Sequence, residues 1–269
     1  MPLRKKDYQN FKASCNQLLP AVELPLQVSE DDQNRFLNSV KALVNSERFS
    51  FVVDLVTLEI TNAIGVDRWL GFAQKPLSMF DYLKIIHPNH VDQLMQMALT
   101  TLEIASQHPG LFKFMDQRMI ACLPIRDLAG RYWWVKRESA AFQFDARGRL
   151  TAYTNLFTVV KEYNGESMVP RYTDRDGNAN AELYEAFVNR YRERIRDHLP
   201  FTKRQFEILK LYAEDAGSTS QQVGQQLAIS KQTIDKHNQS ILIAARNHFA
   251  KAFHSATEVA RFLREEKII

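Results

Sequence analysis

Apolar residues recur along this chain with two different spacings, and the N-terminal half begins with the short spacing that is typical of strands. β-rich runs at residues 51–55 and 57–60 are followed by a turn at residues 64–66. Apolar residues at helical spacing then predict helices over residues 79–86 and 91–106, and an earlier helix over residues 32–44.

Three longer strand-like segments follow, at residues 119–126, 131–144 and 150–161. Both gaps between them begin with aspartate and end with glycine three residues later: Asp127 to Gly130, and Asp145 to Gly148. Aspartate closes a turn through its own carboxylate, and glycine adopts the positive φ that such turns need. These segments predict a three-stranded antiparallel meander.

Past the predicted meander, residues 165–180 are polar and contain glycine and proline, which predicts a linker. Residues 181–198 place apolar side chains four residues apart, with several arginines beside them. The spacing predicts an amphipathic helix. This helix either packs on a neighbouring element or serves as a connector that dimerises or passes a signal.

The C-terminal quarter predicts three helices in quick succession. Thr202 and Gln205 have the spacing of a capping box, which predicts a helix that starts at residue 202. A second helix is predicted over residues 220–227, and Ser230 is a good N-cap for a third. Two short helices joined by a brief turn form a helix-turn-helix.

The third of these helices has one apolar and one polar face. At about 100° per residue, Ile234 and Ile241 coincide and face inward. The polar face opposite them consists of Gln232, Lys236 and Gln239, with Asp235 beside it and His237 on its flank. Such a row of donors and acceptors fits the base edges and phosphates of a DNA major groove. A solvated helix face is the alternative.

Residues 199–269 resemble a LuxR-type DNA-binding domain. The family pattern Leu-Thr-x-Arg-Glu is matched by Phe-Thr-Lys-Arg-Gln from Phe201, and Ile-Ser-x-x-Thr-Val-x-x-His-x-x-x-Ile is matched from Ile229 to Ile241. The resemblance implies that Thr233 and His237 touch phosphates and that residues 235, 236 and 239 point into the major groove. The candidate DNA-binding residues are Thr219, Ser230, Lys231, Gln232, Thr233, Asp235, Lys236, His237 and Gln239.

The chain departs from this family pattern at three positions. Asp235 stands where a basic residue is usual, and an anion there repels phosphate and favours cytosine amino groups. Gln222 stands in place of glutamate, and Gly224 in place of alanine. These departures bear on the operator sequence more than on the fold.

Beyond Ile241 the chain is longer than is usual for the family. Ser255 and Glu258 have capping-box spacing, which predicts a last helix with three apolar residues. In the family, the fourth helix carries the dimer contact. The candidates for dimerisation are therefore Val259, Phe262 and Leu263, and packing inside the domain is the alternative.

Residues 48–163 resemble a PAS domain in the order of their elements: a strand pair, small helices, a longer helix and three antiparallel strands. His87-Pro88-Asn89 matches the His-Pro-Asp/Asn element of PAS domains, and residues 126–133 resemble their strand-turn-strand element. PAS domains sense small molecules, cofactors or light, or pair with each other. The residues do not indicate which of these applies.

The predicted fold class is α+β. The expected parts are a partly helical N-terminal extension, a PAS-like antiparallel-sheet domain, a linker with an amphipathic connector helix, and an all-α, four-helix LuxR-type helix-turn-helix domain. Their expected bounds are residues 1–45, 46–164, 165–199 and 200–269. The role of the extension stays open, because it could cover a pocket, cap the sheet or hang free.

The PAS-like region gives little support for a bound cofactor. The Asn-Cys-Arg-Phe element of flavin-binding light sensors is absent, and Cys122 is expected to be a small buried apolar residue. His87, His90 and His108 are conceivable haem ligands, but each is more typical of a capping or surface histidine. We predict no cofactor, and a small-molecule ligand of unknown identity stays open.

Four aromatic residues adjoin or alternate on one predicted strand: Trp133, Trp134, Phe142 and Phe144. Some of them must face the core, and we expect core packing. The alternatives are a ligand-pocket wall and a sheet-to-sheet dimer surface.

Composition narrows the class of protein. The length of 269 residues favours two domains, and 45% hydrophobic with 25% charged residues is ordinary for a folded soluble protein. Two cysteines exclude a disulfide scaffold and a four-cysteine zinc site. No apolar run approaches the length of a membrane span and no signal-peptide core is present, so the expected location is the cytoplasm.

Charge and motifs point away from catalysis and weakly toward nucleic acid. The formal net charge is +4, and residues 200–269 hold ten Lys/Arg against seven Asp/Glu. So small an excess does not identify a nucleic-acid partner by itself. No Gly-x-Ser-x-Gly, His-Glu-x-x-His or Walker motif occurs, and no enzyme activity is predicted.

The leading hypothesis is a one-component transcription regulator that binds double-stranded DNA as a homodimer, with the PAS-like domain sensing a cue or pairing. A cue would act by favouring one arrangement of the helix at residues 181–198. The alternative is a protein-interaction adaptor whose helix-turn-helix no longer binds DNA specifically. Asp235 and the small charge excess motivate that alternative.

Overall fold

The computed structural model describes residues 3–19, 21–45, 47–70, 77–197, 199–249, 251–265 and 268–269. It divides into two compact units, Met1–Val188 and Asn189–Ile269. The division falls inside helix α6 (Ala181–Asp197), which matches the predicted amphipathic helix except that residue 198 lies outside the described residues. None of the helices in the described part of the chain has the length and apolarity that crossing a membrane requires.

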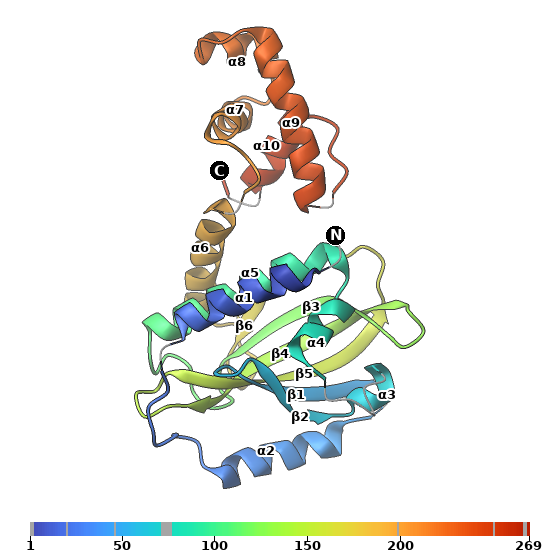
Figure 1. Cartoon of the computed structure of the whole chain (residues 1–269), viewed down its shortest axis with the longest axis vertical. Coiled ribbons are helices and arrows are strands. Elements are labelled where there is room, and N and C mark those ends of the chain that lie inside the picture. The colour runs from blue at the N-terminus through green and yellow to red at the C-terminus, as the bar shows by residue number, and fades with distance from the viewer. Residues whose placement is uncertain are drawn as a thin grey trace. The chain divides into compact units, whose positions relative to one another are not determined.

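A six-stranded antiparallel sheet is the framework of the N-terminal unit (Figure 1). The spatial order is β2-β1-β5-β4-β3-β6. The strands are β1 (Arg48–Asp54), β2 (Glu59–Ile64), β3 (Arg118–Arg126), β4 (Tyr132–Phe144), β5 (Leu150–Glu162) and β6 (Arg171–Thr173). The predicted meander of β3, β4 and β5 is confirmed.

The two turns of the meander close as their sequence predicts. The Asp127 carboxylate accepts a hydrogen bond from the Arg131 amide at 2.8 Å, and Gly130 has a φ of 84°. Asp145 repeats this pattern in the next turn, where Gly148 has a φ of 76°. These turns set the register of the meander, which is continuous from β3 through β5 apart from bulges in β4.

The prediction of a linker over residues 165–180 is wrong in part. β6 lies inside this stretch and pairs antiparallel with β3. Met168 and Tyr172 are buried, and the Tyr172 ring packs on Phe187 of α6 with 5.4 Å between centroids. A strand of three residues between Gly165 and Gly177 is too short for periodicity to detect.

One face of the sheet is covered by α1 (Lys5–Leu18), α4 (Met79–Ile85) and α5 (Pro88–Gln107), and α1 lies alongside α5 (Figure 1). The short α3 (Val66–Leu70) follows β2. The predictions of helices over residues 79–86 and 91–106 are confirmed. α1 is largely polar, and its Phe11 and Cys15 are the side chains that it buries.

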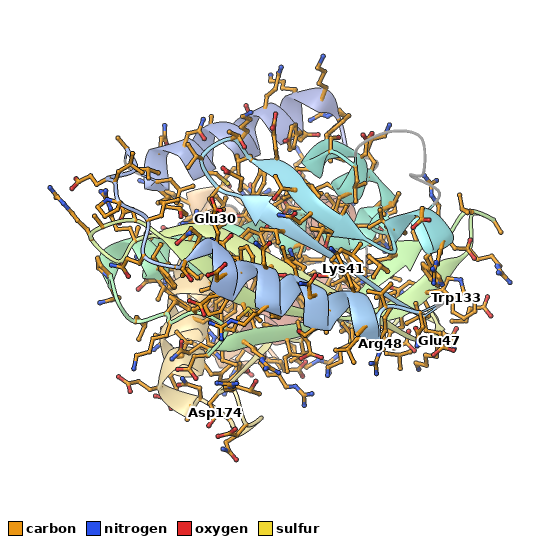
Figure 2. The ribbon with its side chains drawn as sticks, turned by 90° about the horizontal axis from the view of Figure 1, so that it is seen from below. Glu30, Lys41, Glu47, Arg48, Trp133 and Asp174 are labelled. Atoms are coloured by element: carbon orange, nitrogen blue, oxygen red, sulfur yellow. The ribbon has the colours of Figure 1, made fainter. Side chains whose placement is uncertain are left out.

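The opposite face of the sheet is covered by α2 (Glu30–Leu43), as Figure 2 shows from that side with Glu30 and Lys41 near the two ends of the helix. Leu37 of α2 packs with Val52 of β1 and Phe142 of β4. The N-terminal segment therefore packs on both faces of the sheet and does not hang free.

The predicted aromatic residues of β4 pack in the core. Trp134, Phe142 and Phe144 are buried, and Phe142 contacts Phe36 of α2 with 5.9 Å between ring centroids. Trp133 is half-buried and donates to the Asp127 carboxylate at 2.9 Å.

Cys122 and the three candidate histidines differ in their burial and in their hydrogen bonds. Cys122 is only half-buried, contrary to expectation, and it lies opposite Lys136 in the pairing of β3 with β4. His87 is the N-cap of α5 and accepts from the Asn89 amide at 3.3 Å, and His108 is the exposed C-cap. His90 is buried, and its Nε2 lies 2.8 Å from the Tyr163 hydroxyl.

The C-terminal unit contains the four predicted helices, α7 (Lys203–Glu214), α8 (Ser220–Gln226), α9 (Lys231–Phe249) and α10 (Ala256–Glu265). Its core includes the completely buried Leu209, Val223, Ile234, Ile241 and Phe253.

The apolar residues of α10 pack inside this unit, which is the internal alternative left open by the sequence. Val259 and Leu263 are completely buried. Phe262 contacts Phe249 and Phe253, with centroids 5.1 and 5.4 Å apart.

Candidate nucleic-acid interface

Local sequence fixes where α7 and α8 begin. The Thr202 hydroxyl accepts from the Gln205 amide at 3.3 Å, and the Gln205 side chain accepts from the Thr202 amide at 2.8 Å. Thr219 and Gln222 form the same reciprocal capping box at the start of α8. Gln222, which departs from the family's glutamate, therefore still performs the capping that a carboxylate at this position would perform.

The turn between α8 and α9 is tight because residue 224 has no side chain. The Ile229 amide donates to the Gly224 carbonyl at 2.9 Å, and Ala228 lies in the left-handed region with a φ of 52°. A Cβ on residue 224 would stand 2.7 Å from the Ile229 carbonyl oxygen. The glycine that departs from the family pattern is thus required by this backbone approach.

Helix α9 begins at the predicted cap. The Ser230 Oγ accepts from the Thr233 amide at 3.2 Å and lies 2.9 Å from the Thr233 hydroxyl. A helix N-terminus with a hydroxyl pair is a favourable place for a phosphate oxygen.

The two faces of α9 are as the wheel predicts. Ile234, Ile241 and Ala245 are completely buried. Lys231, Gln232, Lys236 and Gln239 are exposed, whereas Thr233, Asp235 and His237 are half-buried. The polar ends of the predicted α9 residues are therefore at least partly accessible.

Asn238 has a role that the sequence analysis missed. Its amide Nδ2 donates to the Tyr212 hydroxyl at 2.9 Å and to the Ser220 Oγ at 3.3 Å. These bonds tie α9 to α7 and to the start of α8. Asn238 therefore fixes the angle at which α9 is presented. Its position four residues after Ile234 was the sequence signal for an inward location.

Asp235 is less isolated than its sequence suggests. Its carboxylate lies 4.0 Å from the Lys231 Nζ, one turn earlier on the same helix. A partly exposed ion pair of this kind is weak, so Lys231 offsets only part of the negative charge of Asp235. Asp235 still disfavours a phosphate directly beside it and still suits a base-edge donor.

Several cations of the unit are engaged in holding it together. Arg204 donates to the Leu227 carbonyl at the end of α8 (2.5 Å), Arg246 to the Phe253 carbonyl (2.6 Å), and Arg264 to the Ala213 carbonyl (2.6 Å). These arginines position the helices. Lys231 and Lys236 are exposed cations in the first two turns of α9.

A shallow hollow extends the polar surface from α9 onto α8. It is lined by Gln221 and Gln225 of α8 and by Ser230 and Lys231 at the start of α9. Glutamine side chains bind phosphate oxygens and so position a protein on a duplex. The sequence analysis did not select Gln221 and Gln225, although the two adjacent glutamine pairs at residues 221–222 and 225–226 were a signal.

Helices α7 to α9, with a polar outward row on the last of them, define a helix-turn-helix domain. Residues 199–243 match the family model described as "Bacterial regulatory proteins, luxR family". The C-terminal domain is accordingly a LuxR-type helix-turn-helix domain. The matched segment ends within α9 and does not include the N-terminal unit.

Three solved structures resemble the chain over most of its length at low identity. Phage VqmA in complex with DPO is 12% identical, covers 88% of this chain and 90% of its own, and gives a TM-score of 0.31. The Vibrio cholerae VqmA dimer in the absence of target DNA is 12% identical, with coverages of 90% and 89% and a TM-score of 0.29. Escherichia coli SdiA is 14% identical, with coverages of 97% and 98% and a TM-score of 0.25.

None of these TM-scores reaches 0.5, and what those proteins bind is a property of those proteins alone. The comparison with curated proteins found no match.

Proposed function

We propose that this chain is a DNA-binding transcription regulator that inserts α9 into the major groove of a duplex. The observation that carries this proposal is the division of α9 into a buried face, with Ile234 and Ile241, and an exposed face, with Lys236 and Gln239. An α-helix fits the major groove, and glutamine and lysine are the residue types that read adenine and guanine there.

The proposed DNA contacts fall into two groups: contacts to phosphates, which position the protein on the duplex, and contacts to base edges, which read its sequence. Thr233, His237 and the start of α9 would bind phosphates, together with Lys231. Gln232, Asp235, Lys236 and Gln239 would face base edges. Thr219 caps α8 through its side chain, and its place at a helix start suits a phosphate contact.

The N-terminal unit is proposed to be a PAS-type module for sensing or dimerisation. Its order of elements supports this: β1 and β2, short helices, the longer α5, and the β3–β5 meander. Two copies of the chain would bind two half-sites about one helical turn apart. A cue would act by favouring one arrangement of α6.

Selection of bound duplexes from a random pool tests the proposal, followed by titration of the best duplex against salt. Replacing Lys231 by Ala should weaken binding and lower the magnitude of the slope of log K against log salt by about 0.9, because one contact between a cation and a phosphate is lost. The matched control is Arg261→Ala, an equal charge loss at an exposed position on α10.

A protein-interaction adaptor is the second candidate, favoured by the carboxylate of Asp235 on the exposed face. The two candidates differ in one result. If the combined Lys236→Ala and His237→Ala variant binds the selected duplex as tightly as the unaltered chain, the regulator proposal is rejected.

A further inference from the structure

The N-terminal unit contains a cavity between its sheet and the helices α1, α4 and α5. Its volume is about 80 Å³, and it is lined mainly by apolar side chains such as Phe11, Leu83, Met95 and Leu102. An engineered apolar cavity of about 150 Å³ admits benzene, so this space suits only a small body unless the walls move. A second hollow of about 180 Å³ shares Leu102 with it.

One charged residue lines this apolar cavity. Arg137 of β4 is 4% exposed, and its Nε and Nη2 atoms have no hydrogen-bond partner. Among the described residues that line the cavity, it is the only ionisable group that carries a charge at neutral pH, and no carboxylate is among them. A buried guanidinium without a carboxylate beside it is strongly unfavourable.

A second buried polar group, the hydroxyl of Tyr82, lies in the same wall. Burial raises the pKa of Tyr82, and Arg137 opposes that rise through its positive charge and a hydrogen bond to the Tyr82 hydroxyl. The two groups thus present donors to one region of the cavity. Ser139, another polar residue of the wall, already donates a hydrogen bond to the Asn155 side chain at 2.7 Å.

We propose that this cavity binds a small apolar monocarboxylate, with Arg137 holding the carboxylate and the apolar walls holding its hydrocarbon body. A guanidinium offers two parallel N–H donors that match the two oxygens of a carboxylate. Ligand sites of this kind combine mostly apolar walls with a few convergent polar groups. The proposal rests on the sensor role given above to the N-terminal unit, but not on DNA binding.

Helix α1 forms part of the wall that a bound ligand would contact. Phe11 and Cys15 of α1 form part of the cavity wall, so a bound ligand would contact this helix and the sheet together. The helix is held outside the cavity by the Tyr8 ring against Phe80 (5.2 Å between centroids) and by Lys12 Nζ, which donates to the Thr57 carbonyl at 3.2 Å. Occupancy would therefore stabilise the docked position of α1.

Thermal unfolding of the full chain, followed by tryptophan fluorescence, tests the proposal without DNA. The probes are propanoate and butanoate, each compared with its uncharged analogue, propanamide or butanamide. We expect concentration-dependent stabilisation by at least one carboxylate and at least about tenfold weaker binding of its amide, because only the carboxylate pairs with the guanidinium. Equal effects of acid and amide, or no effect of either acid, would overturn the proposal.

Arg137→Met supplies an independent test, because stability and ligand binding are expected to change in opposite directions. Removing an unpaired buried charge should raise the melting temperature of the ligand-free protein and at the same time weaken carboxylate binding at least about tenfold. The matched control is Lys136→Met, the next residue on β4, whose ammonium pairs with Glu138 at 2.7 Å and which does not line the cavity.

The variant outcomes are decisive in either direction. Retained carboxylate affinity in Arg137→Met would refute the assignment. A lower melting temperature or a failure to fold would show that Arg137 has a structural partner, which also contradicts the assignment. Because none of these measurements contains DNA, their failure leaves the duplex-binding result untouched, and the reverse also holds.

Discussion

Gly224→Ala is the substitution whose effect follows most directly from the geometry of the helix-turn-helix. The added Cβ would stand 2.7 Å from the Ile229 carbonyl oxygen, which is backbone and cannot swing away as a side chain could. Overpacking of this kind costs typically about 1–3 kcal/mol. Alanine in a helix gains about 0.8–1.0 kcal/mol over glycine. The difference between these two ranges is a destabilisation of the C-terminal unit by about 1 kcal/mol, with an upper bound of about 2 kcal/mol.

Amide hydrogen exchange of the full chain measures this effect where it occurs. The three tryptophans are residues 69, 133 and 134, so tryptophan fluorescence reports on the N-terminal unit instead. Core amides of α9, such as those of Ile234 and Ile241, should exchange about 5- to 30-fold faster in the variant.

Gly217→Ala is the matched control, because its Cβ would meet only the Asp215 side chain, at 3.3 Å. We expect a change within about 0.5 kcal/mol there. If Gly224→Ala proves neutral or stabilising relative to this control, the close approach between residue 224 and the turn is not a constraint, and the reasoning fails.

Two further predictions concern hydrogen bonds at other places in the molecule. Asn238→Ala removes both bonds from α9 to α7 and α8 and should destabilise the C-terminal unit by about 1–2 kcal/mol, whereas the exposed Ser240→Ala should leave exchange rates unchanged. Burial lowers the pKa of His90, so its neutral form is favoured in the folded state and stability is lost as the pH falls below the unfolded value of 6.5 toward that lowered pKa. Melting of the N-terminal unit between about pH 7.5 and about pH 5.5 should therefore depend less on pH in His90→Gln, and an unchanged dependence would contradict this.

The sequence was informative wherever structure is set by a few adjacent residues. Asp127 and Gly130 predict their turn because the carboxylate bonds and the positive φ both lie within the turn itself. Thr202 and Gln205 predict the start of α7 for the same reason. The polar face of α9 could be predicted because Ile234 and Ile241 recur at helical spacing.

Features set by distant contacts could not be predicted in this way. β6 has three residues, and its place is fixed by pairing with β3 and by the packing of the Tyr172 ring on Phe187. The side of β4 on which Arg137 lies depends on the register against β3 and β5, and an arginine between Lys136 and Glu138 is typical of a solvated strand face. The inward location of Arg137 is therefore a property of the assembled sheet.

The central claim, that the exposed row of α9 reads bases, is tested most directly by the sequence preference of Gln239→Ala. Binding is measured on a series of duplexes that differ from the selected site by one base pair. The account predicts relaxed preference at one position in each half-site, by about 1–3 kcal/mol, and an unchanged pattern in Gln226→Ala, an exposed amide at the end of α8. An unchanged pattern in both variants would contradict it.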